Sequence, residues 1–295
     1  MRRVTGRGGL GAAALAAALL AGGLARAGEV SARREPEWFG PRPPAHPSRV
    51  VSLAPSLTDT VVALGLASRL VGVTRYDFAR EAKGLPRVGG FLDPSPEAVL
   101  ALKPDLVLWL ADSGAWPAVR RIAELGVPVL ALPVVGVADV LRTARLVGQA
   151  LGEPSAGEAL AKELSAAVER AERRAASLPH RRVLLVVGRD PLVVAGPGSY
   201  PDALLRIAGG ENVVRGGKPY PVYPLERAVA DDPELVIDAA VNERSAGLAG
   251  LSAIPAVKAG RVVPLDDDRL LRPGPQLGHA VEELLAAVHP EARPE

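Results

Sequence analysis

Short apolar runs rich in Val and Leu alternate along the chain with segments in which apolar residues recur every three or four positions. Runs of the first kind indicate buried strands, and segments of the second kind indicate helices. Their alternation favours parallel βαβ layers. The pattern predicts strands at 49–54, 70–74, 105–110, 127–132, 182–187, 234–238 and 261–264, and helices at 56–65, 96–103, 116–125, 200–208, 224–231 and near 275–288.

Residues 156–178 interrupt this rhythm. Apolar side chains recur there at steps of three and four, and the other positions are charged. Pairs such as Glu158 and Lys162 have the i,i+4 spacing that stabilises a helix. The segment therefore predicts one long amphipathic helix between two α/β halves.

The first residues have a different pattern. Three arginines precede an apolar run from Leu10 to Ala25, and Ala-Arg-Ala ends at Ala27. A basic start, a short apolar run and a small-residue cleavage site are typical of a secretory signal peptide. A membrane-spanning helix is the alternative, but it needs about 20 apolar residues. We expect residues 1–27 to be removed on export, by either the general or the twin-arginine route.

Charge and cysteine content narrow the function. The first 27 residues hold four of the 35 Lys and Arg and none of the 33 Asp and Glu, so the remainder carries 31 basic and 33 acidic residues. This balance gives no reason to expect a nucleic-acid partner. The chain has no cysteine, which excludes disulfides, thiol catalysis and a lipid anchor on an N-terminal Cys. We expect a periplasmic protein that is not lipid-anchored.

One helix-to-strand passage occurs twice. PEAVLALKPDLVL begins at Pro96, and LERAVADDPELVI begins at Leu225. The ungapped pairing aligns Glu226 with Glu97. Duplication of a fold unit accounts for the echo, with one copy in each half. A glutamate in the first turn interacts favourably with the helix dipole and stabilises the helix by about 0.3–1 kcal/mol. A purely structural role for both residues therefore stays open.

The sequence lacks the signatures of most catalytic sites. GPGSYPD does not have the G-x-S-x-G spacing of a nucleophile elbow, and Ser199 is predicted as the N-cap of the helix that follows. Lys218 is followed by Pro219 rather than Ser or Thr, which argues against a P-loop. The four histidines have no metal-ligand spacing. We therefore expect no catalytic residue, no cofactor and no protein-bound metal.

Several motifs resemble one known family. They are RVVSLAPSLTDTVVALGLASRLVGVTRYD, LPRVGGFLDPSPEAVLALKPDLVL, GSYPDALLRIAGGENVV and RPGPQL. The family is the class III, helical-backbone periplasmic substrate-binding proteins of ABC importers, which bind cobalamin, ferric siderophores or haem. The resemblance covers residues 49–288 and is greatest to the cobalamin-binding members. It implies a ligand cleft between two lobes and a long helix that limits their relative motion.

The resemblance also implies roles for individual residues. Tyr76 stands where cobalamin-binding members place a cleft tyrosine, and Phe91 stands where they often have a tryptophan. Tyr220 matches a second cleft aromatic. Asp268 and Arg272 match polar cleft positions of the last loop. Large flat ligands favour aromatic surfaces of this kind.

Two further features bear on ligand and partner. Many cobalamin-type members read Tyr-x-Asp-Tyr-Pro where this chain has YDFA, so the resemblance leaves a corrinoid, a ferric siderophore and haem open as ligands. In this family, glutamates at the positions of Glu97 and Glu226 meet arginine pockets of the permease dimer. The resemblance thus predicts a permease-docking role for both.

These observations predict an α/β protein of two Rossmann-like βαβ lobes joined by one long backbone helix. The expected function is capture of a cobalamin-like corrinoid or other metal chelate for an ABC importer. A module that keeps the fold for signalling or as a scaffold, without ligand, is the alternative of another class. The predicted divisions are a signal peptide at 1–27, a Pro-rich tether at 28–48, an N-terminal lobe at 49–136, linking helices at 137–180, a C-terminal lobe at 181–289 and a tail at 290–295.

Overall fold

A computed structural model describes residues 35–241, 248–265 and 268–292. The predicted signal peptide lies outside these residues. The chain divides into two compact units, each of which is described by itself. The N-unit comprises Gly28–Glu169 and Arg272–Gly278, and the C-unit comprises Arg170–Leu271 and His279–Glu295. The predicted C-terminal lobe therefore loses residues 272–278, which pack in the N-unit instead.

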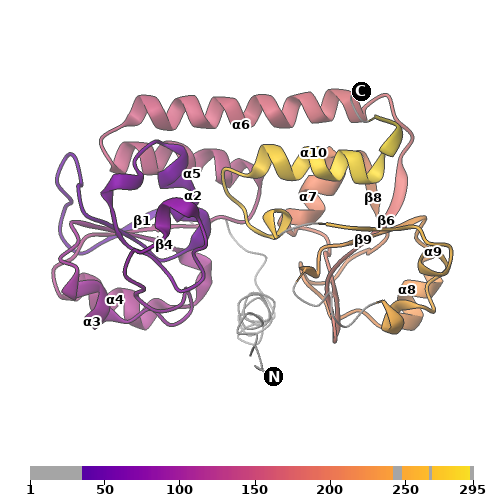
Figure 1. Ribbon diagram of the computed structural model, residues 1–295, viewed down its shortest axis with the longest axis horizontal. Helices are drawn as coiled ribbons and strands as arrows, with labels where there is room; N and C mark the ends of the chain where they lie inside the picture. Colours follow the sequence, from indigo (N-terminus) through magenta and orange to yellow (C-terminus); the bar gives the residue numbers. More distant parts are fainter. Residues whose placement is uncertain (1–34, 242–247, 266–267, 293–295) are drawn as a thin grey trace, which may run out of the picture. The chain divides into compact units, whose positions relative to one another are not determined.

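The N-unit is built on a five-stranded sheet with the strand order β1-β5-β4-β2-β3. All neighbours are parallel except β1, which pairs with β5 in antiparallel fashion. Helices α2 and α5 lie on one face of the sheet, and α3 and α4 lie on the other (Figure 1). The elements are β1 Glu37–Phe39, β2 Val50–Ser52, α2 Pro55–Ala63, β3 Leu70–Gly72, α3 Pro96–Ala101, β4 Leu106–Leu110, α4 Trp116–Glu124, β5 Val129–Leu132 and α5 Val137–Ala150.

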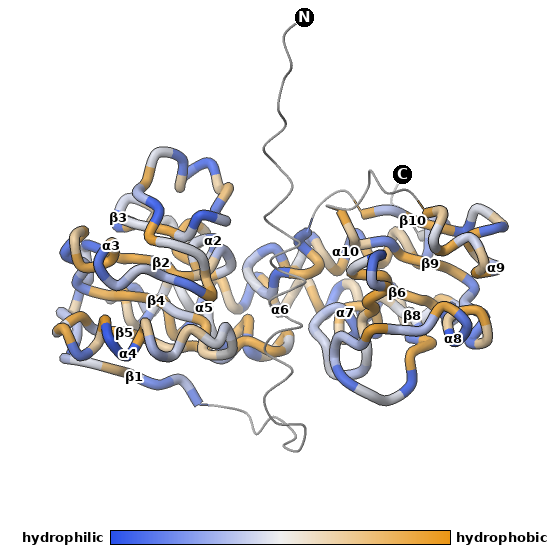
Figure 2. The backbone as a smooth tube through the Cα atoms, turned by 90° about the horizontal axis from the view of Figure 1, so that it is seen from below, coloured by the Kyte–Doolittle hydropathy of each residue, from blue (hydrophilic) through white to orange (hydrophobic). Residues whose placement is uncertain are grey.

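A buried cluster fills the space between the N-unit sheet and α3 and α4. Val107 and Trp109 of β4 pack there against Val119 and Ile122 of α4, and all four are fully buried. Apolar residues on both faces of the inner strands explain why these strands are continuous hydrophobic runs in the sequence. Figure 2 shows the same runs along β2 and β4.

The first strand is a departure from the sequence prediction. Residues 37–39, which we assigned to the Pro-rich tether, form β1 at the sheet edge, with Trp38 opposite Leu130. Phe39 packs edge to face on Trp116 at 5.9 Å between ring centroids. Two aromatic residues inside a Pro-rich segment thus attach it to the N-unit.

The C-unit has a second sheet with the order β10-β9-β6-β7, and β8 pairs with the start of β6. The pairs of β6 with β8 and β9, and of β9 with β10, are parallel, whereas β7 is antiparallel to β6. Helices α8 and α9 lie on the opposite face from α7 and α10 (Figure 1). The elements are β6 Arg181–Arg189, β7 Leu192–Val194, α7 Tyr200–Ile207, β8 Gly210–Asn212, α8 Leu225–Ala230, β9 Leu235–Asp238, α9 Pro255–Lys258, β10 Val262–Pro264 and α10 Leu277–Val288.

The predicted long helix is present as α6, Pro154–Ala175. It crosses the boundary between the units at Glu169 and Arg170. Short 3-10 helices complete the fold at Ala67–Arg69, Arg80–Ala82, Ala111–Ser113, Ala249–Leu251, Arg269–Leu271 and Pro290–Ala292. The α/β fold with two sheets and one long connecting helix confirms the predicted fold class. Within the described residues, no helix is long and apolar enough to span a membrane.

Candidate functional site

The two aromatic residues predicted in the N-unit lie together. Tyr76 follows β3 and Phe91 precedes α3, and their rings meet edge to face with centroids 6.5 Å apart and an interplanar angle of 74°. Both side chains are half-buried. Aromatic residues that leave part of their rings exposed in loops, rather than in the core, are suited to contact a ligand.

Backbone pairing between two loops brings these rings together. The N–H of Arg75 donates to the carbonyl of Gly89 at 2.8 Å, and the N–H of Val88 donates to that of Val73 at 3.0 Å. The turn that follows needs glycine. Gly89 has a φ of +108°, and a Cβ on Gly90 would lie 3.1 Å from the Tyr76 ring and 2.2 Å from an oxygen of Asp93. Gly90 therefore lets the two loops close on each other.

Asp77 fixes the turn that carries Tyr76. Its carboxylate is 2% exposed and accepts hydrogen bonds from the N–H of Thr74 at 2.8 Å and from the Thr74 hydroxyl at 2.5 Å. Burial raises the pKa of Asp77 above its usual value, and polar contacts with Thr74 and with Thr58 of α2 oppose that rise. The two bonds from Thr74 close the turn, whereas the other carboxylate oxygen of Asp77, Oδ1, has no hydrogen-bond partner among the described residues.

Sequence reasoning missed four residues on the loops that carry the pair. The guanidinium of Arg75 lies 5.7 Å from the centroid of the Tyr76 ring and donates to Asp93 at 2.5 Å. Phe78 is 83% exposed and Leu92 is 40% exposed, which is unusual for side chains of this size. The signal for Phe78 was its place in the YDFA segment, two residues after Tyr76.

Tyr220 lies in the C-unit, on the loop between β8 and α8. Hydrogen bonds from Gly196 to Pro219 at 2.8 Å and from Tyr223 to Leu192 at 2.8 Å hold this loop along β7. Tyr220 lies near the backbone of Tyr200, at the start of α7, and burial raises the pKa of Tyr220 to about 12. Tyr220 is therefore a neutral, half-buried phenol at physiological pH.

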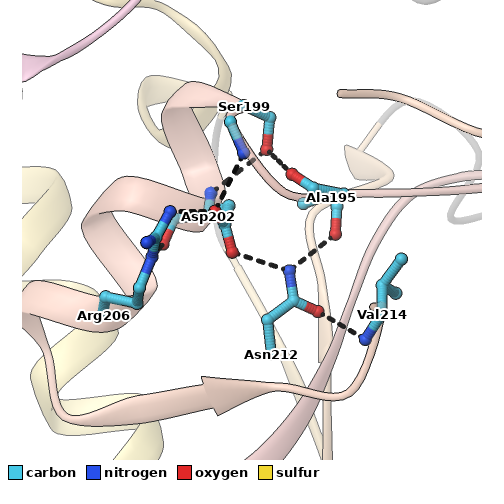
Figure 3. A network of polar contacts seen from close by, with 8 residues as sticks. Ala195, Ser199, Asp202, Arg206, Asn212 and Val214 are labelled. Atoms are coloured by element: carbon cyan, nitrogen blue, oxygen red, sulfur yellow. Dashed lines mark hydrogen bonds and ion pairs between the residues drawn. The ribbon is translucent and has the colours of Figure 1, made fainter. Parts of the chain in front are cut away.

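The motif GSYPDALLRIAGGENVV has a structural role in the C-unit. Ser199 caps α7 by accepting from the N–H of Asp202 at 3.2 Å, which confirms the predicted N-cap. Figure 3 shows Asp202 at the centre of a buried network, where it accepts from the side chain of Asn212 at 2.9 Å and from Arg206. Asn212 also donates to the carbonyl of Ala195 at 2.9 Å. The network ties α7 to β8.

The polar residues of the last loop fall in different units. Asp268 belongs to the C-unit, whereas Arg272 belongs to the N-unit. Arg272 donates to Asp59 of α2 at 3.3 Å, and both side chains are largely buried. This ion pair anchors the returning segment 272–278 on α2. The structure thus joins Tyr76 to Phe91 and Arg272 to Asp59, as two separate contacts.

Glu97 and Glu226 occupy equivalent positions in α3 and α8, each in the first turn and each exposed. The Ser95 hydroxyl caps α3 through the N–H of Ala98 at 3.2 Å and donates to Glu97 at 3.1 Å. In α8 the N-cap is Pro224, which offers no side-chain cap. Both carboxylates are therefore available at the surface.

Within the described residues, no group of three or more His, Cys, Asp and Glu side chains is placed to hold a metal ion. A surface cavity of about 260 Å³ in the C-unit lies at the ends of α6 and α7 and is lined by Glu172, His180 and Arg206 among others. It does not include any of the predicted ligand residues.

Comparison with known proteins gives the family. Residues 50–269 match the periplasmic binding protein family. A vitamin B12-binding protein of Vibrio vulnificus is 27% identical over 246 residues, which cover 80% of this chain and 88% of that protein. An uncharacterised ABC transporter substrate-binding lipoprotein of Bacillus subtilis is 28% identical over 259 residues, with 83% and 81% of the two chains covered.

A solved structure agrees with this assignment. The periplasmic haem-binding protein of Pseudomonas aeruginosa is 32% identical, covers 84% of this chain and 95% of its own, and superposes with a TM-score of 0.76. The family match extends over more than half of the chain, and the fold has the expected two α/β units. The chain belongs to the periplasmic binding protein family, as an extracytoplasmic substrate-binding protein of the class III group that serves ABC importers for vitamin B12, haem and ferric siderophores.

Proposed function

We propose that this chain captures a metal tetrapyrrole, in the first place a cobalamin-like corrinoid, and delivers it to the permease of an ABC importer. The observation that supports this is the half-buried edge-to-face pair of Tyr76 and Phe91, with the exposed Phe78 two residues further along the chain from Tyr76. A flat macrocycle can cover such rings and gain wide apolar contact at a low cost in side-chain entropy. Tyr220, Asp268 and Arg272 remain predicted ligand contacts.

Haem is the second candidate, and two observations favour it. The haem-binding protein of Pseudomonas aeruginosa is 32% identical to this chain, compared with 27% for the vitamin B12-binding relative. In addition, a tyrosine hydroxyl can serve as an axial ligand of haem iron, and Tyr76 presents one at the candidate site. YDFA, which departs from the cobalamin-type pattern, points the same way.

Visible absorption titrations of the chain from Gly28 onward test the proposal. Corrinoids, haem and a ferric siderophore would be added in turn, because each has a distinct spectrum. We expect one tetrapyrrole per chain. Tyr76→Ala and Phe91→Ala should each weaken binding by about 1–3 kcal/mol, the loss typical of a well-packed aromatic contact. Trp38→Ala, at an exposed aromatic of the sheet edge, is the matched control.

The titrations separate the alternatives. Tight binding of a siderophore with no tetrapyrrole bound would replace the ligand assignment within the family. Binding of none of the three would favour the scaffold alternative.

We also propose that residues 1–27 direct export and that the mature chain begins at Gly28. The absence of cysteine leaves no site for an N-terminal diacylglycerol anchor, in contrast to the Bacillus subtilis lipoprotein. Mass spectrometry of the protein released from the periplasm should give the mass of residues 28–295. A mass that includes residues 1–27 would refute cleavage at this position.

A further inference from the structure

A charged pair borders the aromatic pair of the N-unit. The side chain of Arg75 is 48% exposed and that of Asp93 is 64% exposed, and a guanidinium N–H donates to the Asp93 carboxylate at 2.5 Å. The same guanidinium lies over the Tyr76 ring at 5.7 Å from the centroid. A Cβ on Gly90 would be 3.3 Å from Arg75, 3.1 Å from Tyr76 and 2.2 Å from Asp93. The three side chains therefore converge on one glycine.

The cation is well fixed, whereas its partner is easily exchanged. The backbone of Arg75 is held by the Gly89 carbonyl, and the cation–π contact orients the guanidinium. In contrast, an ion pair as exposed as that of Arg75 with Asp93 contributes little to stability, because water and salt screen it. Guanidinium groups also bind carboxylates in a planar, two-pronged geometry. A second carboxylate that arrived at the Tyr76 ring could therefore replace Asp93.

We propose that Arg75 determines ligand specificity by pairing with a carboxylate on the side arm of the bound macrocycle, a position that Asp93 occupies in the free protein. This inference rests on the proposed function and narrows its ligand, within the tetrapyrroles, to those with free carboxylates: an acidic corrinoid or haem rather than fully amidated cobalamin. Haem carries two propionate carboxylates, and acidic corrinoids carry free carboxylates, whereas the side arms of cobalamin are amides. The site should select acidic tetrapyrroles over amidated or esterified forms of the same ring.

The two members of the pair have opposite expected effects. Arg75→Gln removes the cation and should reduce the preference for the acid form by about tenfold, the scale of a partly exposed charge-assisted hydrogen bond. Asp93→Asn removes the competing carboxylate and should increase that preference. If the pair had only a structural role, the two substitutions would shift the preference for the acid form in the same direction or leave it unchanged. Added salt should weaken the preference of the unaltered protein.

The experiment measures the ratio of dissociation constants for matched ligands, haem against haem dimethyl ester and cobyrinic acid against its amidated form. Arg80→Gln, at an exposed arginine of the neighbouring 3-10 helix, is the control and should leave the ratio unchanged. Circular dichroism checks that each variant is folded.

If the macrocycles bind but Arg75→Gln keeps the acid preference of the unaltered protein, or if that protein has none, this inference is wrong while the proposed function stands. If Asp93→Asn lowers the preference, exchange of the partner is wrong. If no tetrapyrrole binds in either form, both the proposed function and the inference fail.

Discussion

The two copies of the repeated passage agree more closely in backbone than in sequence. Helix α3 and strand β4 in the N-unit begin at residues 96 and 106, and α8 and β9 in the C-unit begin at 225 and 235, so both offsets are 129. Lys103 and Asp232, which follow the helices, are also 129 positions apart. Both have a positive φ, of 47° and 42°, and they are the non-glycine residues with this conformation among those described.

An arginine from the preceding strand region holds the left-handed turn in each copy. Arg49 donates to the carbonyl of Leu102 at 2.6 Å and to that of Lys103 at 3.1 Å, and Arg182 donates to that of Asp232 at 2.6 Å. In return, Asp105 accepts from the N–H of Arg49 at 2.9 Å. Such a shared device satisfies carbonyls that a helix end leaves unpaired.

Glu234 completes the second copy of this device, since it accepts from the N–H of Arg182 at 2.9 Å. The two copies therefore share the turn at the end of the helix together with the exposed glutamate at its start. The interior of the two copies has changed. Trp109 of β4 corresponds to Asp238 of β9, and both are buried.

The environments of these two residues explain how each is tolerated. Trp109 donates to the Ser113 hydroxyl at 2.7 Å and meets Trp116 edge to face at 4.6 Å. Asp238 forms a two-pronged ion pair with Arg189, whose side chain is 8% exposed. Near the end of its strand, β4 of the N-unit thus has a buried aromatic cluster, whereas β9 of the C-unit has a buried ion pair at the equivalent position.

The largest expected effect is at this changed position. Trp109→Ala should cost about 3–5 kcal/mol through the cavity that it leaves. Asp238→Ala should cost a similar amount, about 3–5 kcal/mol, because it leaves the Arg189 charge without this buried partner. Urea denaturation measures both. Tryptophan fluorescence reports only the N-unit, since Trp38, Trp109 and Trp116 all lie there, so circular dichroism is needed for the C-unit.

The result for Asp238→Ala would show whether its ion pair with Arg189 stabilises the end of the sheet or is merely tolerated there. If Asp238→Ala is nearly neutral, water or other groups satisfy Arg189, and the charge pair does not stabilise the sheet end. Trp38→Ala, on the exposed edge strand, is the control for loss of an aromatic.

The sequence was informative where local pattern and burial agree. The strands at 105–110 and 234–238 and the helix at 156–178 were located within a few residues, because buried parallel strands are uninterrupted apolar runs and α6 is strongly amphipathic. Strand β1 was not predicted, since its three residues lie among prolines and become a strand only through pairing with β5. Edge strands of this length carry almost no periodic signal.

The site was predicted in part for a similar reason. Tyr76 and Phe91 were predicted from a family resemblance, which identifies single positions in the sequence but not the contacts between them. The contact of Arg75 with Asp93 joins residues 18 apart and depends on the turn at Gly89 and Gly90. Nothing in a local pattern indicates which two charges a loop closure brings together.

The next largest loss of stability is expected at the two arginines that bond to the left-handed turns. Arg49→Ala and Arg182→Ala should each destabilise by about 1–2 kcal/mol, because each loses charge-assisted hydrogen bonds to backbone carbonyls that are partly exposed. Equal losses would show that the two copies use the same device. Arg42→Ala, at an exposed position before the first helix, is the control. A loss of stability in only one of the two variants would show that the two turns are not stabilised in the same way.

A smaller effect is expected at the left-handed residues themselves. Lys103→Gly should stabilise the protein by about 0.5–1 kcal/mol, because glycine adopts a positive φ without steric cost and this relief exceeds its added entropy in the unfolded chain. Asp232→Gly should gain less, since its carboxylate also lies 3.5 Å from Arg182. Melting temperatures of the two variants measure the difference. Destabilisation in both would mean that neither turn is strained.

The smallest expected effect on stability is at Glu97 and Glu226. As first-turn acids they contribute about 0.3–1 kcal/mol each through the helix dipole, and Glu97 has an additional bond from Ser95. We predict that Glu97→Arg and Glu226→Arg leave ligand affinity unchanged, because neither residue touches Tyr76 or Phe91 in the contacts described. Transport into cells or vesicles that contain the cognate permease should nevertheless decrease in each single variant and be lost in the double variant.

The predicted docking role would separate what the repeat does for folding from what it does for transport. In that role the carboxylates meet arginine pockets of the permease, so charge reversal should replace a charge-assisted pair with repulsion. Glu97→Gln and Glu226→Gln remove the charge without repulsion and should give intermediate transport. Full transport by the double Arg variant would refute the docking role, and so would a large loss of stability in the single variants. In either case, the equivalent glutamate of each copy would serve only to stabilise the start of its helix.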